Sequence, residues 1–278
     1  MAQPQELTEE EKQMLQGGCH GASALPPRLT PNEGSSVKHV IGVVSGKGGV
    51  GKSLVTSLLA AKMQRRGYKV AILDADVTGP SIPRAFGVAA GVEGDGLGIF
   101  PAQTESGIKI MSTNLMLPED DAPVAWRGPV VSNAVKQFFN EVHWGDIDYM
   151  FVDMPPGTSD VALTVFQSLP IDGIVTVSAP QELVAMIVGK AVNLANRMDV
   201  KVMALVENMA YFTCPDCNKR HFIFGEPQGA EVAKRSGIPA YATLPMDPSF
   251  AALCDAGKVE QYLVSEALDP VIAQILEA

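Results

Sequence analysis

A glycine-rich run near residue 50 constrains the fold of this 278-residue chain more than any other feature. Residues 46–53 read GKGGVGKS, which fits the pattern G-x-x-x-x-G-K-[ST]. The run follows a valine-rich segment of strand length at 37–44 and precedes a segment of helical character at 54–66. Glycines let backbone N–H groups approach a phosphate without a Cβ in the way, and the following helix directs its positive end at the same anion. The sequence therefore predicts a strand, a phosphate-binding loop and a helix. The alternative is a glycine-rich turn that matches by chance.

The rest of the chain alternates short apolar runs with amphipathic segments. We expect strands at 69–73, 108–111, 149–152, 173–177, 200–206 and 240–244, and helices at 130–142, 161–169, 183–198, 228–236, 249–256 and 270–276. Asp269 is expected to cap the last helix, with Pro270 at its first position. Apolar strands alternating with helices predict a mostly parallel sheet with helices on both faces, which is the α/β class. We expect a single domain over residues 37–278.

Residues 1–36 have a different character. Thr8 and Glu11 have the spacing of a capping box, and Gly17-Gly18 would end a short helix. Prolines and an Asn-Glu-Gly-Ser-Ser run follow. The sequence predicts a flexible N-terminal tail, acidic near its start and rich in Pro and Gly.

Composition excludes several function classes. The formal net charge is −10, which disfavours general binding to nucleic acid or to an anionic membrane. The chain starts without the basic and apolar stretches of a signal peptide, and no uncharged apolar run reaches the ~18–20 residues of a membrane helix. The four cysteines, Cys19, Cys214, Cys217 and Cys254, are too few to staple a secreted domain of this length. We therefore expect a cytoplasmic protein.

Carboxylates follow the predicted strands where a nucleotide site needs them. Within the glycine-rich run, Lys52 would reach the β- and γ-phosphates and Ser53 would bind Mg²⁺. An apolar strand ends at Asp153, as expected of the carboxylate on the Mg²⁺ side. The loop after it contains Pro155-Pro156-Gly157, and the Gly157 N–H is a candidate sensor of the γ-phosphate.

A second pair of carboxylates, Asp74 and Asp76, follows the strand at 69–73. At i and i+2 past a strand end, both point toward the edge where open α/β sheets bind ligands. Their separate roles do not follow from the spacing. The alternative is that one of them only forms a turn before Gly79-Pro80.

Cys214 and Cys217 form a C-x-x-C pair just past the strand at 200–206. A redox pair is disfavoured because the residues that follow, 218–221, do not resemble a helix. A tetrahedral Zn²⁺ site or a [4Fe–4S] cluster needs four ligands, and this pair supplies two. Either His221 and another residue complete a zinc site within the chain, or a partner subunit supplies its own pair.

The second lysine of the glycine-rich run, Lys47, gives the pattern K-G-G-x-G-K-S. This pattern resembles the deviant phosphate loops of the class of ATPases that includes MinD, Mrp and the nitrogenase iron protein. In that class the early lysine reaches the nucleotide of a partner subunit, so the resemblance implies a homodimer with two ATP molecules. The alternative is a solvated loop lysine.

Five runs, SGKGGVGKS, DADVTGPSIP, WRGP, DMPPGTSD and VENMAYFTCPDC, resemble the Mrp/ApbC family of ATP-dependent iron–sulfur cluster carriers in the expected order. The resemblance implies a P-loop NTPase domain and a slow ATPase that holds a labile [4Fe–4S] cluster between Cys214 and Cys217 of two subunits and hands it to apo-proteins. It also implies that Asp76 orients water, that Asp74 supports the Mg²⁺ shell and that Asn208 lies at the adenine. The expected ATP-binding residues are Gly46, Lys47, Gly48, Gly49, Val50, Gly51, Lys52, Ser53, Gly157 and Asn208; the expected catalytic ones are Lys47, Lys52 and Asp76; and Mg²⁺ is expected at Ser53, Asp74 and Asp153.

The other two cysteines are expected to lie outside this site. Cys19 stands alone beside His20, so a second stable cluster in the tail is not expected. Cys254 lies in a predicted helix and is expected to pack in the core.

Three other functions are compatible with parts of the pattern. A partitioning or division-site ATPase needs a basic tail, but residues 259–278 contain no Lys or Arg. An ATPase that targets tail-anchored proteins needs a long methionine-rich insertion, and the 12 methionines here are scattered. A zinc-stabilised nucleotide-binding scaffold with negligible turnover is the third, and the sequence leaves it open.

Overall fold

The computed structural model describes residues 28–76, 79, 81–89, 91–116, 128–157, 160–180, 184–262 and 266–278. The predicted N-terminal helix, Cys19 and the first two residues of the WRGP run lie outside these residues. Among the residues described, no helix is both long enough and apolar enough to cross a membrane.

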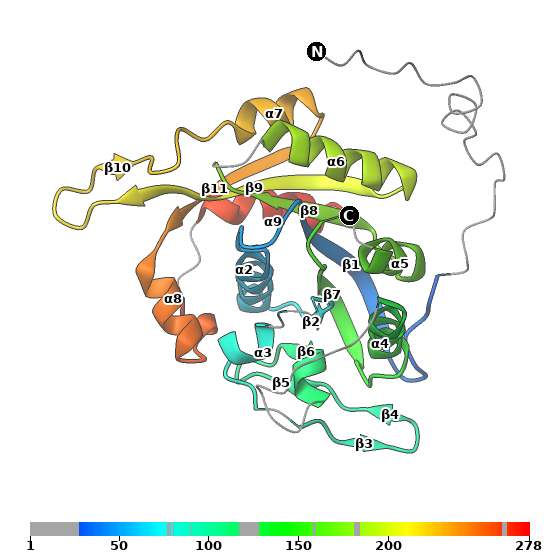
Figure 1. Ribbon diagram of the computed structural model, residues 1–278. Helices are drawn as coiled ribbons and strands as arrows, with labels where there is room; N and C mark the ends of the chain where they lie inside the picture. Colours follow the sequence, from blue (N-terminus) through cyan, green and yellow to red (C-terminus); the bar gives the residue numbers. More distant parts are fainter. Residues whose placement is uncertain are drawn as a thin grey trace, which may run out of the picture.

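A nine-stranded sheet forms the centre of the molecule, in the order β10-β9-β8-β1-β7-β2-β6-β5, with β11 also paired to β9 (Figure 1). All its neighbours are parallel except β5 with β6 and β10 with β9. The α/β class and the mostly parallel sheet are therefore confirmed. The strands are β1 (Ser36–Ser45), β2 (Val70–Asp74), β5 (Ala102–Gln103), β6 (Lys109–Met111), β7 (Asp146–Asp153), β8 (Gly173–Ser178), β9 (Lys201–Thr213), β10 (Arg220–His221) and β11 (Ala240–Met246), and a separate small hairpin pairs β3 (Gly94–Asp95) with β4 (Gly98–Ile99).

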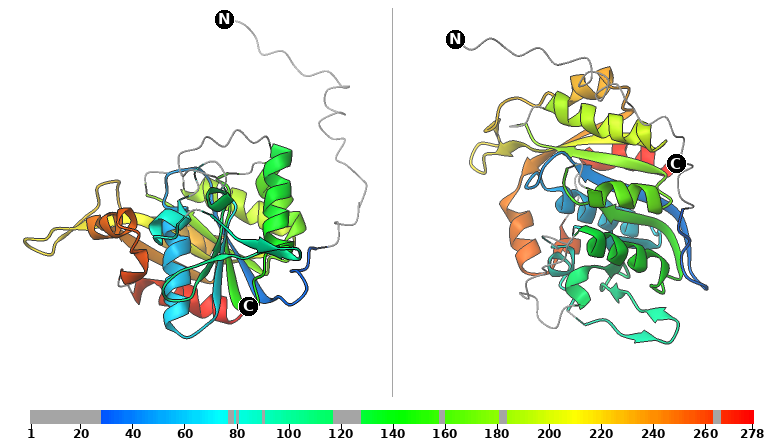
Figure 2. Two further views of the ribbon diagram at one scale, coloured as in Figure 1. Left: turned by 90° about the horizontal axis from the view of Figure 1, so that it is seen from below. Right: turned by 45° about the vertical axis from the view of Figure 1, so that its right-hand side comes forward.

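Helices cover both faces of the sheet, as the alternation of apolar strands and helices predicts (Figures 1 and 2). One apolar cluster packs α2 and α9 against one face, and a second packs α4 and α5 against the other. Successive residues of β1 divide between the two: Val40 lies in the second cluster and Ile41 in the first. The helices are α2 (Lys52–Arg65), α3 (Ile82–Ala85), α4 (Gly128–Asn140), α5 (Asp160–Ser168), α6 (Val184–Arg197), α7 (Gly229–Arg235), α8 (Pro248–Asp255) and α9 (Asp269–Leu276), with short 3₁₀ turns at Thr113–Met116, Val259–Gln261 and Glu266–Leu268.

The strand order brings the predicted site together. β7 lies between β1 and β2, and Asp74 at the end of β2 is paired in register with Asp153 at the end of β7. The phosphate-binding loop leaves β1 beside them. Because parallel strands end at the same edge, residues about eighty positions apart in sequence lie in one site.

Two predicted boundaries are wrong. Asp269 is the first residue of α9 rather than its cap, and its carboxylate accepts from Arg66 Nη2 at 2.6 Å instead. β9 does not end at residue 206 but continues to Thr213, because β11 pairs with it beyond that point. The pairing shifts register between Glu207 and Tyr211, and Met209 in this bulge has a positive φ of 57°. A positive φ is uncommon for a residue with a side chain, so the bulge is a strained position in the strand.

Candidate functional site

The phosphate-binding loop connects β1 to α2, as predicted. Gly49 and Gly51 have φ values of 84° and 85°, a conformation that residues with a side chain rarely adopt. A Cβ on Gly51 would also lie 2.2 Å from Asn208 Nδ2. The glycine at position 51 is therefore required both by the backbone conformation and by the close approach of β9.

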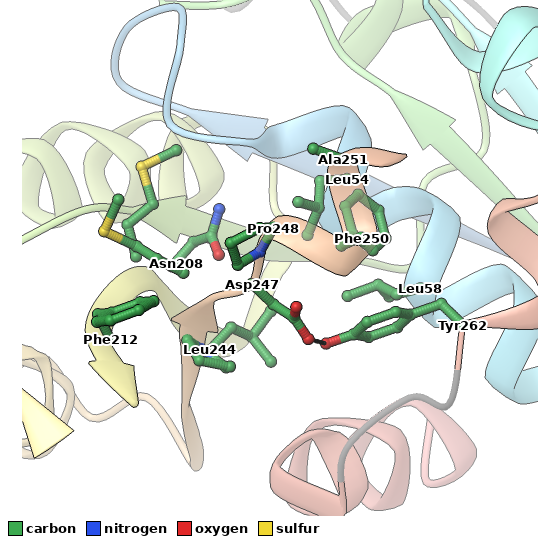
Figure 3. A pocket seen from close by; sticks show the side chains of 13 residues that line it. Leu54, Leu58, Asn208, Phe212, Leu244, Asp247, Pro248, Phe250, Ala251 and Tyr262 are labelled. Atoms are coloured by element: carbon green, nitrogen blue, oxygen red, sulfur yellow. Dashed lines mark hydrogen bonds between the residues drawn. The ribbon is translucent and has the colours of Figure 1, made fainter. Parts of the chain in front are cut away.

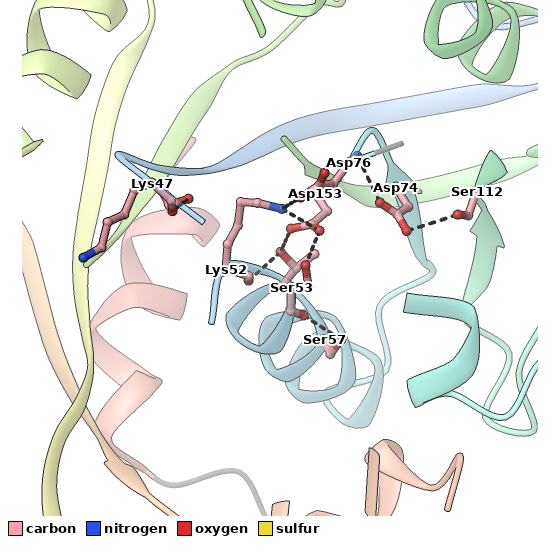
Figure 4. A network of polar contacts seen from close by, with 10 residues as sticks. Lys47, Lys52, Ser53, Ser57, Asp74, Asp76, Ser112 and Asp153 are labelled. Carbon is pink, nitrogen blue, oxygen red and sulfur yellow. Dashed lines mark hydrogen bonds and ion pairs between the residues drawn. The ribbon is translucent and has the colours of Figure 1, made fainter. Parts of the chain in front are cut away.

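Lys52 lies at the centre of a buried polar network (Figure 4). Its Nζ is 2.7 Å from Asp153 Oδ2 and 3.4 Å from Asp76 Oδ2. The Ser53 hydroxyl donates to Asp153 Oδ2 at 2.6 Å, and the Thr56 hydroxyl donates to Asp153 Oδ1 at 2.8 Å. Thr56 was missed by sequence reasoning, although it lies one helical turn after Lys52 on the same side of α2. One cation, two hydroxyls and two carboxylates thus converge at the start of α2.

Asp74 lies beside this network and is fully buried. Its carboxylate accepts from the Asp76 N–H and the Ser112 hydroxyl, each at 3.1 Å. Burial and the neighbouring charge of Asp153 raise the pKa of Asp74 to about 8, although Lys52 acts in the opposite direction. At neutral pH Asp74 is therefore largely neutral in the nucleotide-free protein.

This pKa predicts how stability depends on pH. The pKa of an Asp in the unfolded chain is about 3.9, so between about pH 4 and 8 the folded state binds the additional proton. The free energy of unfolding should then decrease as the pH rises through this range and level off above it. In Asp74→Asn the decrease should be smaller, because the ionisable group is absent. Denaturant unfolding at several pH values, without nucleotide or Mg²⁺, measures this decrease in the free energy of unfolding.

The matched control for Asp74→Asn is Asp148→Asn. Hydrogen bonds from Lys38 and from the Lys69 backbone lower the pKa of Asp148, so it titrates below the range in question. An Asp74→Asn variant that loses as much stability between pH 5 and 8 as the unchanged protein would contradict the assignment.

Gly157 contacts the end of β1, where the phosphate-binding loop begins, and Asn208 contacts the loop itself. The Gly157 N–H, the predicted γ-phosphate sensor, donates to the Ser45 carbonyl at 2.9 Å. Asn208 Nδ2 donates to the Val50 carbonyl at 2.9 Å and is buried. Asn208 therefore lies against the loop, but from inside β9 rather than from the predicted end of a strand.

Lys47 is exposed at the outer part of the loop. Its side chain points away from the Lys52 and Asp153 network (Figure 4). The two lysines of the loop therefore have different environments within one chain: Lys52 lies inside the carboxylate cluster, and Lys47 faces outward.

An apolar cavity of about 420 Å³ lies next to the loop, between α2, β9 and α8 (Figure 3). Leu54 and Leu58 of α2 form one wall, and Met209 and Phe212 of β9 form another. Asn208 supplies an amide at its edge. The segment that closes it, 244–251, is held by Asp247, whose carboxylate accepts from the Tyr262 hydroxyl at 2.8 Å and from the Ser249 N–H at 2.8 Å. Sequence reasoning missed this cavity; the run Pro245-Met246-Asp247-Pro248 after a strand was its only signal.

The cysteine pair lies in the turn that connects β9 to β10. The Cys214 N–H donates to the Lys219 carbonyl, and the Asn218 N–H donates to the Cys214 carbonyl, both at 2.9 Å. Cys214 is half-buried and Cys217 exposed, and both are free thiols. Hydrogen bonds from the backbone N–H groups of Cys217 and Asp216 lower the pKa of the Cys214 thiol. The turn thus favours a thiolate, which is the form that binds metals.

The zinc site proposed within one chain is not formed by the described residues. No group of three or more His, Cys, Asp or Glu side chains in that part of the chain is arranged to hold a metal ion. His221 lies in β10, paired with Phe212. Cys254 packs against the core, as predicted, and burial raises its pKa to about 11.

Glu207 is a buried carboxylate that sequence reasoning missed, and it anchors the segment that follows the cysteine hairpin. Glu207 Oε2 accepts from the Gly229 N–H at 2.8 Å and from the Tyr241 hydroxyl at 2.7 Å. Gly229 begins α7, the helix that follows the hairpin. Glu207 therefore ties the returning chain to β9, one residue before Asn208 contacts the phosphate-binding loop.

Comparison with known proteins agrees with this geometry. A family model described as "ParA: NUBPL iron-transfer P-loop NTPase" matches residues 36–277. A protein of Clostridium perfringens named iron–sulfur cluster carrier protein is 45% identical over 264 residues, which cover 92% of both chains. One of the same name from Saccharolobus solfataricus is 45% identical over 225 residues, covering 80% of this chain and 76% of the relative.

Solved structures show the same fold. A nucleotide-binding protein from Archaeoglobus fulgidus, in complex with ADP and with cobalt, has a TM-score of 0.75 and 42% identity, covering 82% of this chain and 89% of that one. The cell division ATPase MinD of Pyrococcus furiosus has a TM-score of 0.58 at 17% identity, covering 86% and 98%, and shows the fold alone. The resemblance of the five sequence runs to the Mrp/ApbC family is thereby confirmed: the chain belongs to the iron–sulfur cluster carrier family of P-loop NTPases.

Proposed function

We propose that the protein binds and hydrolyses ATP and carries a labile [4Fe–4S] cluster between two copies of the chain, for transfer to apo iron–sulfur proteins in the cytoplasm. The observation that carries the proposal is the combination, in one chain, of a P-loop network with a turn that holds two free thiols, Cys214 and Cys217, and favours a thiolate at Cys214. Relatives that are 45% identical carry the name iron–sulfur cluster carrier protein, and the ADP complex of the relative from Archaeoglobus fulgidus supports the nucleotide part.

The residues around Lys52 fit ATP and Mg²⁺. The Ser53 hydroxyl and the Asp153 carboxylate are the oxygen ligands that Mg²⁺ prefers, and Asp74 lies behind Asp153 in the adjacent strand. When bound there, Mg²⁺ would neutralise charge on the β- and γ-phosphates. Lys52, which now contacts two carboxylates, would turn to the phosphates. Asp76, the more exposed of the two carboxylates, would orient the attacking water.

The cavity beside the loop fits the nucleoside. Its apolar walls, Leu54 and Phe212, can stack on or pack against a flat base, and the Asn208 amide supplies both a donor and an acceptor at the edge. This arrangement agrees with the role of Asn208 that the family resemblance implies.

Two observations support a dimer. Lys47 is exposed and points away from the carboxylates around Lys52, which leaves its side chain able to reach the nucleotide of a partner. The cysteine turn supplies two thiols, and a [4Fe–4S] cluster needs four ligands. A second copy related by a two-fold axis would complete both sites.

β9 offers a direct physical connection between the two sites. Asn208 contacts the phosphate-binding loop, Met209 and Phe212 line the cavity, and Cys214 follows the last residue of the strand. The Gly157 N–H would leave the Ser45 carbonyl to bind the γ-phosphate and return to it after hydrolysis. We infer that these changes alter access to the cysteine turn through β9.

The test is anaerobic reconstitution of the full chain with iron and sulfide, followed by metal analysis, sedimentation and transfer to an apo-protein. The expected result is about four irons and four sulfides per two chains, a loaded dimer, and delivery of the cluster. Retention of zinc alone would favour the scaffold function. A loaded monomer would contradict the shared cluster.

A further inference from the structure

The return arm of the cysteine hairpin carries three basic and two apolar residues in succession. Lys219, Arg220 and His221 are exposed, and Phe222 and Ile223 are 43% and 58% exposed. We call these five residues the hairpin patch. The hairpin extends away from the sheet, to the left in both Figure 1 and Figure 2. The patch is therefore open to another molecule.

The hairpin patch is positively charged, whereas the molecule as a whole is negatively charged. The chain as a whole has a formal net charge of −10, while Lys219 and Arg220 contribute two adjacent positive charges. Within the described residues, neither forms an ion pair with a carboxylate. The Arg220 guanidinium lies 4.3 Å from the centroid of the Tyr211 ring, which holds it against β9. The charge of Arg220 is thus held against β9, next to the turn of the hairpin.

The apolar residues of the patch lie in a turn. The Gly225 N–H donates to the Phe222 carbonyl at 3.2 Å, and Gly225 has a φ of 94°. The turn keeps Phe222 and Ile223 at the surface, away from the three apolar clusters of the core. The two adjacent exposed apolar side chains and the positive charge beside them offer a partner both apolar and charged contacts.

The patch is also adjacent to the thiols. The Cys214 N–H bonds to the Lys219 carbonyl, and Arg220 is paired with Thr213 in the β-ladder. A protein seated on the patch would therefore lie beside the cysteine turn. Transfer of a cluster between thiols needs that proximity, because the donor and acceptor sulfurs must reach the same iron.

We propose that the hairpin patch is the docking surface for the acceptor, and that the acceptor is an apo iron–sulfur protein with carboxylates and an apolar residue around its own cysteines. This proposal rests on the proposed function. An acidic partner is repelled by most of this acidic molecule and can pair with Lys219 and Arg220, which lie beside the cysteines. The second copy that shares the cluster would meet this chain at Cys214 and Cys217. Because its own hairpin patch carries the same positive charge, direct pairing of the two patches is disfavoured.

The test measures binding of the apo form of an acidic [4Fe–4S] ferredoxin to the iron-free carrier, by fluorescence anisotropy. In Lys219→Gln/Arg220→Gln the affinity at about 0.05 M NaCl should fall about tenfold, and most of its dependence on salt should disappear. In Phe222→Ser/Ile223→Ser the affinity should also fall about tenfold, but its dependence on salt should be unchanged. The control Lys234→Gln/Arg235→Gln removes equal charge from exposed positions of α7 and should bind as the unchanged protein does.

Other outcomes overturn the proposal. Equal binding by all variants means that the patch does not dock the acceptor. Loss of self-association in sedimentation, with probe binding unchanged, means that the patch pairs two copies of the chain. Unchanged affinity for a probe whose carboxylates are amidated means that charge does not select the partner. Iron loading is measured separately, so a protein that docks the probe but loads no cluster fails the proposed function alone.

Discussion

Replacing Lys47 with Ala should reduce ATP hydrolysis by at least about a thousandfold, which is the contribution of a cationic residue supplied to the transition state by a partner. The free energy of unfolding should remain within about 0.5 kcal/mol of the unchanged protein, because the side chain is exposed. Steady-state phosphate release and denaturant unfolding measure the two quantities. If Lys47→Ala hydrolyses ATP at the full rate, Lys47 is only a solvated loop residue.

Lys52→Ala provides the contrast within the same loop. Lys52 is buried against Asp153, so its removal leaves a buried carboxylate without a cation. The unpaired carboxylate should lower the free energy of unfolding by about 3–5 kcal/mol. ATP hydrolysis should be lost as well. The two lysines can therefore be told apart by stability, although both variants lose hydrolysis.

Mixing two inactive variants tests whether Lys47 acts across subunits. In a dimer of one Lys47→Ala chain and one Asp76→Ala chain, the Lys47→Ala chain keeps its own Asp76 and receives Lys47 from its partner. Random mixing makes half of the dimers mixed, each with one complete site, so about one quarter of the activity should return. No recovery, with mixed dimers present, would contradict a lysine that acts in trans.

Replacing Cys214 with Ala should abolish stable cluster binding. Two variant chains would offer two thiols in place of four, which is too few to hold a [4Fe–4S] cluster. Iron and sulfide content and the thiolate-to-iron absorbance band measure the loss after anaerobic reconstitution. Cys217→Ala should behave in the same way.

Cys254→Ala is the matched control for the cysteine variants. Cys254 is half-buried in α8 and packs against the core, far along the chain from the hairpin. Cys254→Ala should therefore bind as much iron as the unchanged protein does. The hairpin lies outside the apolar clusters, so Cys214→Ala should keep its circular dichroism and its nucleotide binding. If Cys214→Ala retains as much iron as the unchanged protein, the cluster assignment is wrong.

Local patterns predicted which side chains come together around Lys52. The glycine-rich run and the carboxylates at the ends of two strands act at short range in sequence, and parallel pairing then brings Asp74 and Asp153 into register. The network around Lys52 was therefore visible in the sequence, apart from Thr56, whose role depends on which side of α2 faces Asp153.

Features that depend on pairing between distant segments could not be predicted in this way. The length of β9 follows from β11, and the apolar cavity needs α2, β9 and the segment 244–251 to be placed together. The neutral state of Asp74 follows from complete burial next to a second carboxylate. The hydrogen bonds that favour the Cys214 thiolate exist only once the turn has formed.

The continuity of β9 has a consequence for how such chains can change in length. Side chains alternate between the two faces of a strand, so one residue added between Ala210 and Thr213 would turn the cysteine turn toward the opposite face of the sheet. Two added residues would return the cysteine turn to its original face of the sheet and move the thiols outward by about 7 Å. Only insertions of even length therefore preserve the direction in which the cysteines are presented, and each one separates the thiols further from the nucleotide.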